Sequence, residues 1–263
     1  MILSRRAALN GVQLDELYGR IVIRGIELGA TEESVDTVSM LGGAGQRILR
    51  THAETMTVTV KWAMDVPKDD LITRRRIYED VCKWARQKGW LTVSYMPERK
   101  LYVDKVKFSG AELFKWTDEY EITFTAYSVP FWQDVFPVSV EKTNVSSTTF
   151  NMVIPGQEQT VAEVDFINTS TEALTSFSIA IGGSTISLTG LLIVQNIHLI
   201  IDHTETGILR IYGWDGVNAV SGYSLRTAGS ADDLYVDPGT AGVALIADKA
   251  GTLKVSVRGR YGS

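Results

Sequence analysis

The feature that most constrains this chain is an alternation of apolar and polar residues with a period of two. In the segment 55–63, apolar residues occupy every second position, and threonine fills most of the polar positions. Because successive side chains of a strand point to opposite faces, this pattern predicts a half-buried strand. Comparable apolar alternation recurs at 91–95, 120–126, 162–166, 177–181, 186–188, 197–201 and 253–257.

Turn residues separate most of these runs, among them Gly182-Gly183 and Asp215-Gly216. Many short strands joined by turns are typical of sandwiches and barrels. The sequence therefore predicts a mostly β protein, with an N-terminal β-barrel or sheet domain that packs one helix and a C-terminal β-sandwich.

One segment, residues 70–88, has helical spacing instead. Ile77, Val81 and Trp84 fall within one arc of a 3.6-residue wheel, while charged residues occupy the far side. An aspartate at position 69 or 70 suits the N-cap. We expect this helix to lie across a sheet with Trp84 pointing inward.

The composition changes near Pro137. Before it lie the helix, five of the six tryptophans and most of the basic residues. After it come a stretch rich in serine and threonine and then a half whose pattern is all strand. We therefore expect two domains, residues 1–136 and residues 137–263.

The charge and the cysteine content of the chain exclude several classes of function. The chain has 26 basic and 31 acidic residues, a net charge of −5, which argues against a protein whose main task is to hold nucleic acid phosphates. The lone cysteine, Cys82, excludes an intrachain disulfide or a four-cysteine zinc site. No apolar run approaches the ~20 residues of a membrane span, and no signal-peptide pattern is present. We expect a soluble protein made in a reducing cytoplasm.

No motif predicts catalysis, a cofactor or a metal site. Gly42–Gly45 lacks the third glycine and the following helix of a dinucleotide site. His198 and His203 are five residues apart on a predicted strand, so they face opposite sides and cannot share a metal. The other candidates are interpreted as structural or solvated groups: His52, Asp202, the acidic loop of Asp232, Asp233 and Asp237, Cys82, and the helical Arg74–Arg76.

The six tryptophans fall into two groups. Three lie in patterned segments and are predicted to be core residues: Trp62, Trp84 and Trp116. Three lie next to turns, where aromatic side chains often serve interfaces or ligands: Trp90, Trp132 and Trp214. Trp214 precedes the Asp215-Gly216 turn, and it is a candidate sugar-stacking platform or interface anchor.

The order of elements carries further information. A strand at 18–26, the glycine-rich loop, a long strand at 50–63 and the helix are followed by strand patterns from Leu91 and Tyr120 and by Pro130-Phe131-Trp132. The second half shows strand patterns starting at Val164, Phe177, Leu199 and Leu253. This succession resembles the distal tail protein (Dit) family of long-tailed, siphovirus-type bacteriophages.

The resemblance implies an N-terminal ring domain and a galectin-like C-terminal β-sandwich. It implies a hexameric ring that joins the tail tube to the tail-tip hub or baseplate and serves as a platform for adhesion proteins. The implied partners are copies of the chain itself, the tail tube, tail hub and tape measure proteins, and receptor-binding proteins, with no membrane and with DNA only as passing cargo. Such a protein is made in the bacterial host cytoplasm, acts at the virion tail tip, and has no active site and no cofactor.

The outer face of the segment 55–63 is the candidate ring interface. Thr55, Thr57, Thr59 and Lys61 point to one side, and Lys61 is the only charge among them. Such a weakly protected face suits burial against a neighbouring copy. The alternative function is a carbohydrate-binding β-sandwich module that uses the C-terminal half and Trp214. A β-rich hydrolase is a third hypothesis, which no motif supports.

Overall fold

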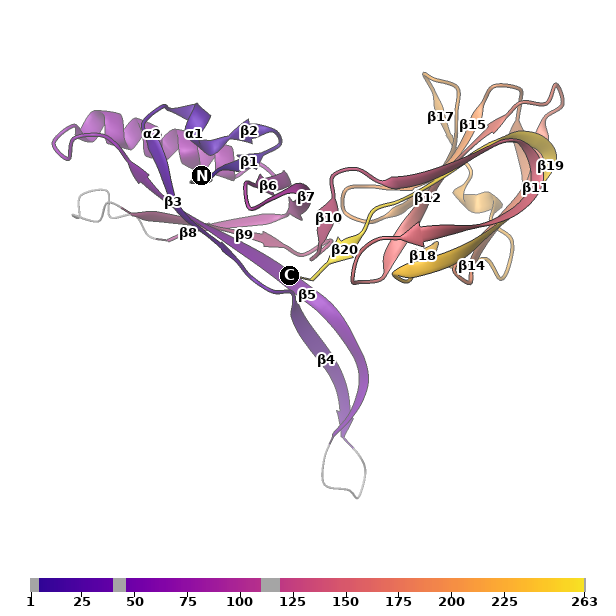
Figure 1. Ribbon diagram of the computed structural model, residues 1–263, viewed down its shortest axis with the longest axis horizontal. Coiled ribbons are helices and arrows are strands. Elements are labelled where there is room, and N and C mark those ends of the chain that lie inside the picture. The colour runs from indigo at the N-terminus through magenta and orange to yellow at the C-terminus, as the bar shows by residue number, and fades with distance from the viewer. Residues whose placement is uncertain (1–4, 40–45, 110–118, 263) are drawn as a thin grey trace. The chain divides into compact units, whose positions relative to one another are not determined.

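The computed structural model describes residues 5–39, 46–109 and 119–262, which form mainly antiparallel β-sheet (Figure 1). The chain divides into two compact units. The first comprises residues 1–133 together with 262–263, and the second comprises residues 134–261. Both units are built on sheets, so the predicted mostly β fold is confirmed.

The central sheet of the first unit has the strand order β3-β5-β9-β8. Its strands are β3 (Ile21–Leu28), β5 (Gln46–Met64), β9 (Tyr120–Ala126) and β8 (Lys105–Phe108). A further strand, β4 (Glu32–Ser39), pairs with the first part of β5, and the two form a hairpin that extends beyond the sheet (Figure 1). Met56, Val58, Val60 and Trp62 alternate along β5 and are almost fully buried, as the period of two predicts.

Helix α2 (Leu71–Ala85) packs on the apolar face of this sheet. Ile77 and Val81 are completely buried and Trp84 is 3% exposed, so the predicted helical phase is confirmed. The Trp84 ring meets the Phe124 ring of β9 edge to face, with centroids 5.9 Å apart. The helix ends three residues before the predicted limit at residue 88.

Polar contacts fix the N-terminal part of the helix. Asp70 is the N-cap, and its carboxylate accepts a hydrogen bond from the backbone N–H of Thr73 at 3.1 Å. Arg74, expected on the solvated side, is only 5% exposed, so that expectation is wrong. Its guanidinium donates to the carbonyl oxygen of Val66 and to the hydroxyl of Tyr120, and these two acceptors compensate its burial.

A second sheet of the first unit runs β2-β1-β6-β7. Its strands are β2 (Val12–Gln13), β1 (Ala7–Leu9), β6 (Gly89–Val93) and β7 (Met96–Val103), and the short helix α1 (Leu14–Leu17) follows β2. The indole of Trp84 donates to the carbonyl oxygen of Val12 at 3.0 Å, which connects α2 to this sheet. Strand β10 (Trp132–Asp134) begins at the last residues of this unit. Trp132, which the sequence placed among the candidates for an interface or a ligand, is fully buried.

The second unit is a sheet of nine strands that curls around one apolar core. The strand order is β14-β13-β19-β12-β15-β16-β17, with β11 on β19 and β18 on β12. The bounds are β11 (Val138–Ile154), β12 (Thr160–Asn168), β13 (Leu174–Ile181), β14 (Ser184–Ile193), β15 (His198–His203), β16 (Leu209–Trp214), β17 (Ala219–Ser221), β18 (Tyr235–Val236) and β19 (Gly239–Val257). A 3₁₀ turn, η1 (Tyr223–Leu225), and a short strand, β20 (Arg260–Tyr261), complete the unit.

The long strand β19 lets the sheet curl. Its first part pairs with β13 and its second part with β12, and the change of partner falls between Ala247 and Gly251. A Cβ atom at Gly251 would lie 2.4 Å from the carbonyl oxygen of Ile167 and equally close to the Phe166 ring. Only glycine therefore allows this close approach of the two strands.

Trp84→Ala is expected to destabilise the protein by about 3–5 kcal/mol, because it leaves a cavity between α2 and the sheet. Denaturant unfolding of the full chain measures this change. Ile72→Ala is the matched control on the same helix, since Ile72 is 81% exposed, and it should change stability by less than about 0.5 kcal/mol. Equal effects of the two variants would contradict the helical packing described here.

Asp248 of β19 is expected to make stability depend on pH. Burial raises its pKa, but hydrogen bonds from Thr175 and from the backbone N–H of Ser176 outweigh burial, and the net pKa lies below its usual value. A depressed folded-state pKa gives stability that is present above the unfolded-state value of about 3.9 and is lost as the pH falls. The midpoint of unfolding should fall more steeply below pH ~4 in the wild type than in Asp248→Asn; parallel curves would contradict this.

Candidate interaction surfaces

The outer face of β5 carries three of the four residues predicted to form a ring interface. Thr57, Thr59 and Lys61 are half-buried and point away from the apolar face. Thr59 and Thr123 of β9 share a hydrogen bond of 3.2 Å between their hydroxyl oxygens. The ammonium of Lys61 lies 2.5 Å from a carboxylate oxygen of Glu27 and 3.7 Å from one of Glu121. The contacts of Thr59 and Lys61 thus link three strands, β3, β5 and β9.

The hydrogen bond to Glu27, followed by the negative charge of that carboxylate, raises the pKa of Lys61. Lys61 is therefore charged at neutral pH and is neutralised locally by two carboxylates. From Val58 to Trp62, β5 pairs with β3 on one side and with β9 on the other. In this part of β5 both strand edges are paired, so a neighbouring copy could contact only the face of the strand.

Thr55, the fourth predicted interface residue, lies in a different environment. Its side chain is buried, with the residue 8% exposed, and its hydroxyl donates to a carboxylate oxygen of Glu32 on β4 at 2.8 Å. This contact lies at the end of β4 nearest the sheet, where the β4–β5 hairpin begins. This hydrogen bond therefore joins β4 and β5 at the base of the hairpin, within a single chain.

A second surface lies on the outer side of β15 and β16. Ile211 of β16 points into the core, so Arg210, Tyr212 and Trp214 point the other way. The register places His198 opposite Trp214 and Asp202 opposite Arg210. The sequence did not reveal this grouping, because it depends on how the two strands pair.

The polar groups on this surface hold one another in place. The guanidinium of Arg210 donates two hydrogen bonds to the carboxylate of Asp202, at 2.8 and 2.7 Å. The Tyr212 hydroxyl donates to the same carboxylate at 2.9 Å, and the guanidinium lies 5.5 Å from the centre of the Tyr212 ring. Burial, and then the hydrogen bond to Asp202, raises the pKa of Tyr212, so its hydroxyl stays protonated.

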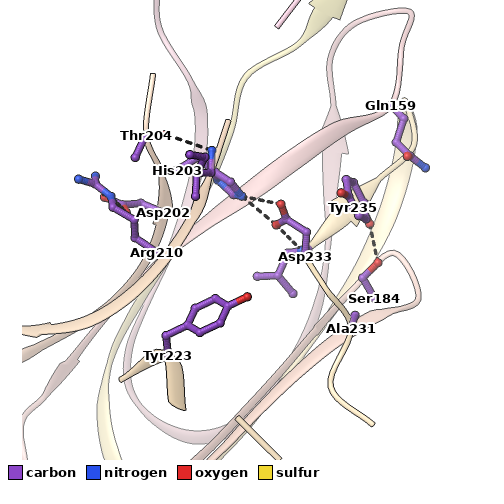
Figure 2. Close-up of polar contacts among 12 residues, drawn as sticks. Gln159, Ser184, Asp202, His203, Thr204, Arg210, Tyr223, Ala231, Asp233 and Tyr235 are labelled. Atoms are coloured by element: carbon purple, nitrogen blue, oxygen red, sulfur yellow. Dashed lines mark hydrogen bonds and ion pairs between the residues drawn. The ribbon is translucent and has the colours of Figure 1, made fainter. Parts of the chain in front are cut away.

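His203 lies on the opposite side of β15 from Asp202, because successive residues of a strand face opposite sides (Figure 2). Its partner is Asp233, not the adjacent Asp202: the Nε2 atom lies 2.8 and 2.9 Å from the two carboxylate oxygens. Both side chains are less than a tenth exposed, and Asp233 also accepts from the backbone N–H of Leu234 at 2.7 Å. The pair connects β15 to the loop before β18.

The remaining candidates have partners within the protein. Asp237 accepts from Gln159, and Asp232 lies 3.8 Å from Arg226, so the acidic loop is dispersed among separate partners. Cys82 is buried beside Tyr78, and burial raises the pKa of its thiol. Over the residues that the structure describes, no three metal-ligating side chains converge, and no helix is long and apolar enough to cross a membrane. Gly42–Gly45, Trp116 and the side chain of His52 lie outside the described part.

Comparison with known proteins identifies the fold. No family model and no curated protein matches the sequence. Among solved structures, the SPP1 Dit (gp 19.1) protein, described as a paradigm of the hub adsorption apparatus in phages that infect Gram-positive bacteria, superposes with a TM-score of 0.67. The match covers 97% of this chain and 98% of that one, at 13% identity.

Two structures of the phage P2 baseplate in its activated conformation also match. The calcium form has a TM-score of 0.52 and 9% identity, over 97% of each chain. The strontium form has a TM-score of 0.50 and 11% identity, over 95% of this chain and 97% of that one. The chain thus has a Dit-like fold over nearly its whole length, which confirms at the level of fold the resemblance inferred from the order of elements.

Asp233→Ala is expected to cost about 1–3 kcal/mol of stability, because it leaves the buried imidazole of His203 without its acceptor. Thermal or denaturant unfolding of the full chain measures the loss. Asp237→Ala is the control in the same acidic loop, since Asp237 is exposed, and it should change stability by less than about 0.5 kcal/mol. A neutral effect at both positions would show that the pair does not stabilise the unit.

Proposed function

We propose that this chain is a structural distal tail protein of a bacteriophage or prophage. The observation that carries the proposal is the match of both units, in one chain and in the same order, to SPP1 Dit over nearly the full length of each protein. In this proposal the first unit is the ring-forming domain and the second is a galectin-like outer domain. The protein is a virion component at the tail tip and not an enzyme.

We infer a homohexameric ring formed by the first unit. The half-buried outer face of β5 supports this inference, since the hydroxyl of Thr59 and the charge of Lys61 already have partners. Burying polar groups that are hydrogen-bonded costs much less than burying unpaired ones. A head-to-tail contact on such a face closes into a ring if the rotation between copies allows it. Each neighbouring pair should bury at least about 1,200 Å² in total.

The ring joins the tail tube to the tail-tip hub and carries adhesion proteins on its outer domains. Its partners are the tail tube, tail hub and tape measure proteins and receptor-binding proteins. The net charge of −5 per chain supports a channel that does not retain DNA, because an acidic ring releases no counterions from passing phosphates.

Thr59→Arg is expected to abolish the ring, because it places a much larger, charged side chain in the contact between copies. Light scattering at micromolar concentration, with the tail hub protein present to allow closure, should give six copies for the wild type and one for the variant. Thr171→Arg, an exposed threonine of the second unit, is the matched control and should leave the hexamer intact.

Two results would overturn parts of this proposal. A wild-type protein that stays monomeric with the hub protein present would remove the ring. A tail-tip reconstruction in which the second units line the channel would reverse the roles of the two units.

A further inference from the structure

Trp214 differs from the other tryptophans that the structure describes. Trp62 stacks on Tyr120, Trp84 donates a hydrogen bond to a backbone carbonyl, and Trp132 is fully buried. Trp90 is half-buried, but its ring meets Tyr102 and the ammonium of Lys100. Trp214 is also half-buried, yet among the described residues its ring has no aromatic, cationic or hydrogen-bonding partner. The apolar face of an indole that has no such partner can pack against a ligand.

The positions around Trp214 leave room beside the ring. On β17 the residue opposite Trp214 is Ala219, whose side chain is small. On the other side His198 lies opposite, and its Nδ1 atom is 2.8 Å from a carboxylate oxygen of Asp165 on β12. The side chain of His198 is 32% exposed, so its second ring nitrogen remains available to a ligand.

Further along β16 stands a fixed set of hydrogen-bonding groups. Arg210 uses Nε and one terminal nitrogen on Asp202, which leaves its Nη1 donors unoccupied within the described residues. Its side chain is 48% exposed. Arg210 and Trp214 are four residues apart on one face, which separates them by about 13 Å along the strand. The surface is therefore longer than one sugar ring.

An apolar platform beside rigid planar polar groups has the chemistry that a neutral sugar requires. The C–H face of a pyranose packs on an aromatic ring, while its hydroxyls both donate to carboxylates and accept from guanidinium or imidazole groups. Because Arg210, Asp202 and Tyr212 already fix one another, little side-chain entropy is lost on binding. The carboxylates of Asp165, Asp202 and Glu163 outnumber the cationic side chains of Arg210 and Lys254 around them, and this excess disfavours a negatively charged glycan.

We propose that the outer face of β15 and β16 binds a neutral oligosaccharide, with one ring stacked on Trp214 and hydroxyl groups held by His198, Asp202 and Arg210. This site belongs to the second unit alone and does not depend on ring formation. It gives the second unit a ligand of its own, separate from any protein that it carries.

The test uses the full-length protein on an array of neutral hexose and N-acetylhexosamine oligosaccharides, with uronic-acid and phosphorylated glycans beside them. The wild type should bind at least one neutral oligosaccharide and none of the anionic ones. Titration with the best neutral oligosaccharide should show at least a tenfold loss of affinity in Trp214→Ala, about 1.4 kcal/mol. Tyr235→Ala, which removes another exposed aromatic ring of the same unit, should bind as the wild type does.

Thermal unfolding verifies that each variant is folded. If Trp214→Ala does not fold, Arg210→Gln serves in its place, since it changes an exposed side chain and should weaken binding at least fivefold. The proposal is overturned if the wild type binds no neutral glycan at millimolar concentration. It is equally overturned if anionic glycans bind better, or if the folded variant binds as the wild type does.

Discussion

The opposite orientation of neighbouring side chains on a strand governs both units of this protein. Each strand that supplies the core with one set of residues must present the other set outward. On β5 the inward set is Met56 to Trp62 in steps of two, and the outward set is threonine and lysine. On β16 the inward residue Ile211 separates Arg210 from Tyr212 on the outer face. The residues of the core and those of the outer faces are therefore specified by the same few segments.

Local patterns predicted part of the strands and the direction of the helix. The period of two identified β5 and, in the second unit, all or part of β12, β13, β14, β15 and β19, but not the long strand β11 or β16. The spacing of Ile77, Val81 and Trp84 predicted which side of α2 is buried. Such local patterns do not predict contacts between residues that are far apart in the sequence. Trp132 lies beside a turn in the sequence and is nevertheless fully buried, and Arg74 is buried because Val66 and Tyr120 supply acceptors.

The same limit applies to the candidate sites. Asp202 is adjacent to His203 in the chain, but adjacency on a strand places the two side chains on opposite faces, and the partner of His203 is Asp233, thirty residues away. Likewise, Trp214 could be selected from its position before a turn, whereas the arrival of His198 and Arg210 on its face depends on the register of β15 and β16. The register is a property of the pair of strands, so the sequence of either strand alone does not predict it.

The two outer faces differ in the kind of contact that they can stabilise. On β5, Thr59 bonds to Thr123 and Lys61 to Glu27, so these polar groups already have partners, and the stability of the proposed contact must come from a wide area. On β16, the contact of Arg210 with Asp202 is fixed, but the Nη1 donors of Arg210 remain open within the described residues, and the half-buried indole of Trp214 lies further along the same face. A few directed hydrogen bonds and one stacking contact suffice there. The first face therefore fits the proposed contact with another copy of the chain, and the second fits the proposed sugar ligand.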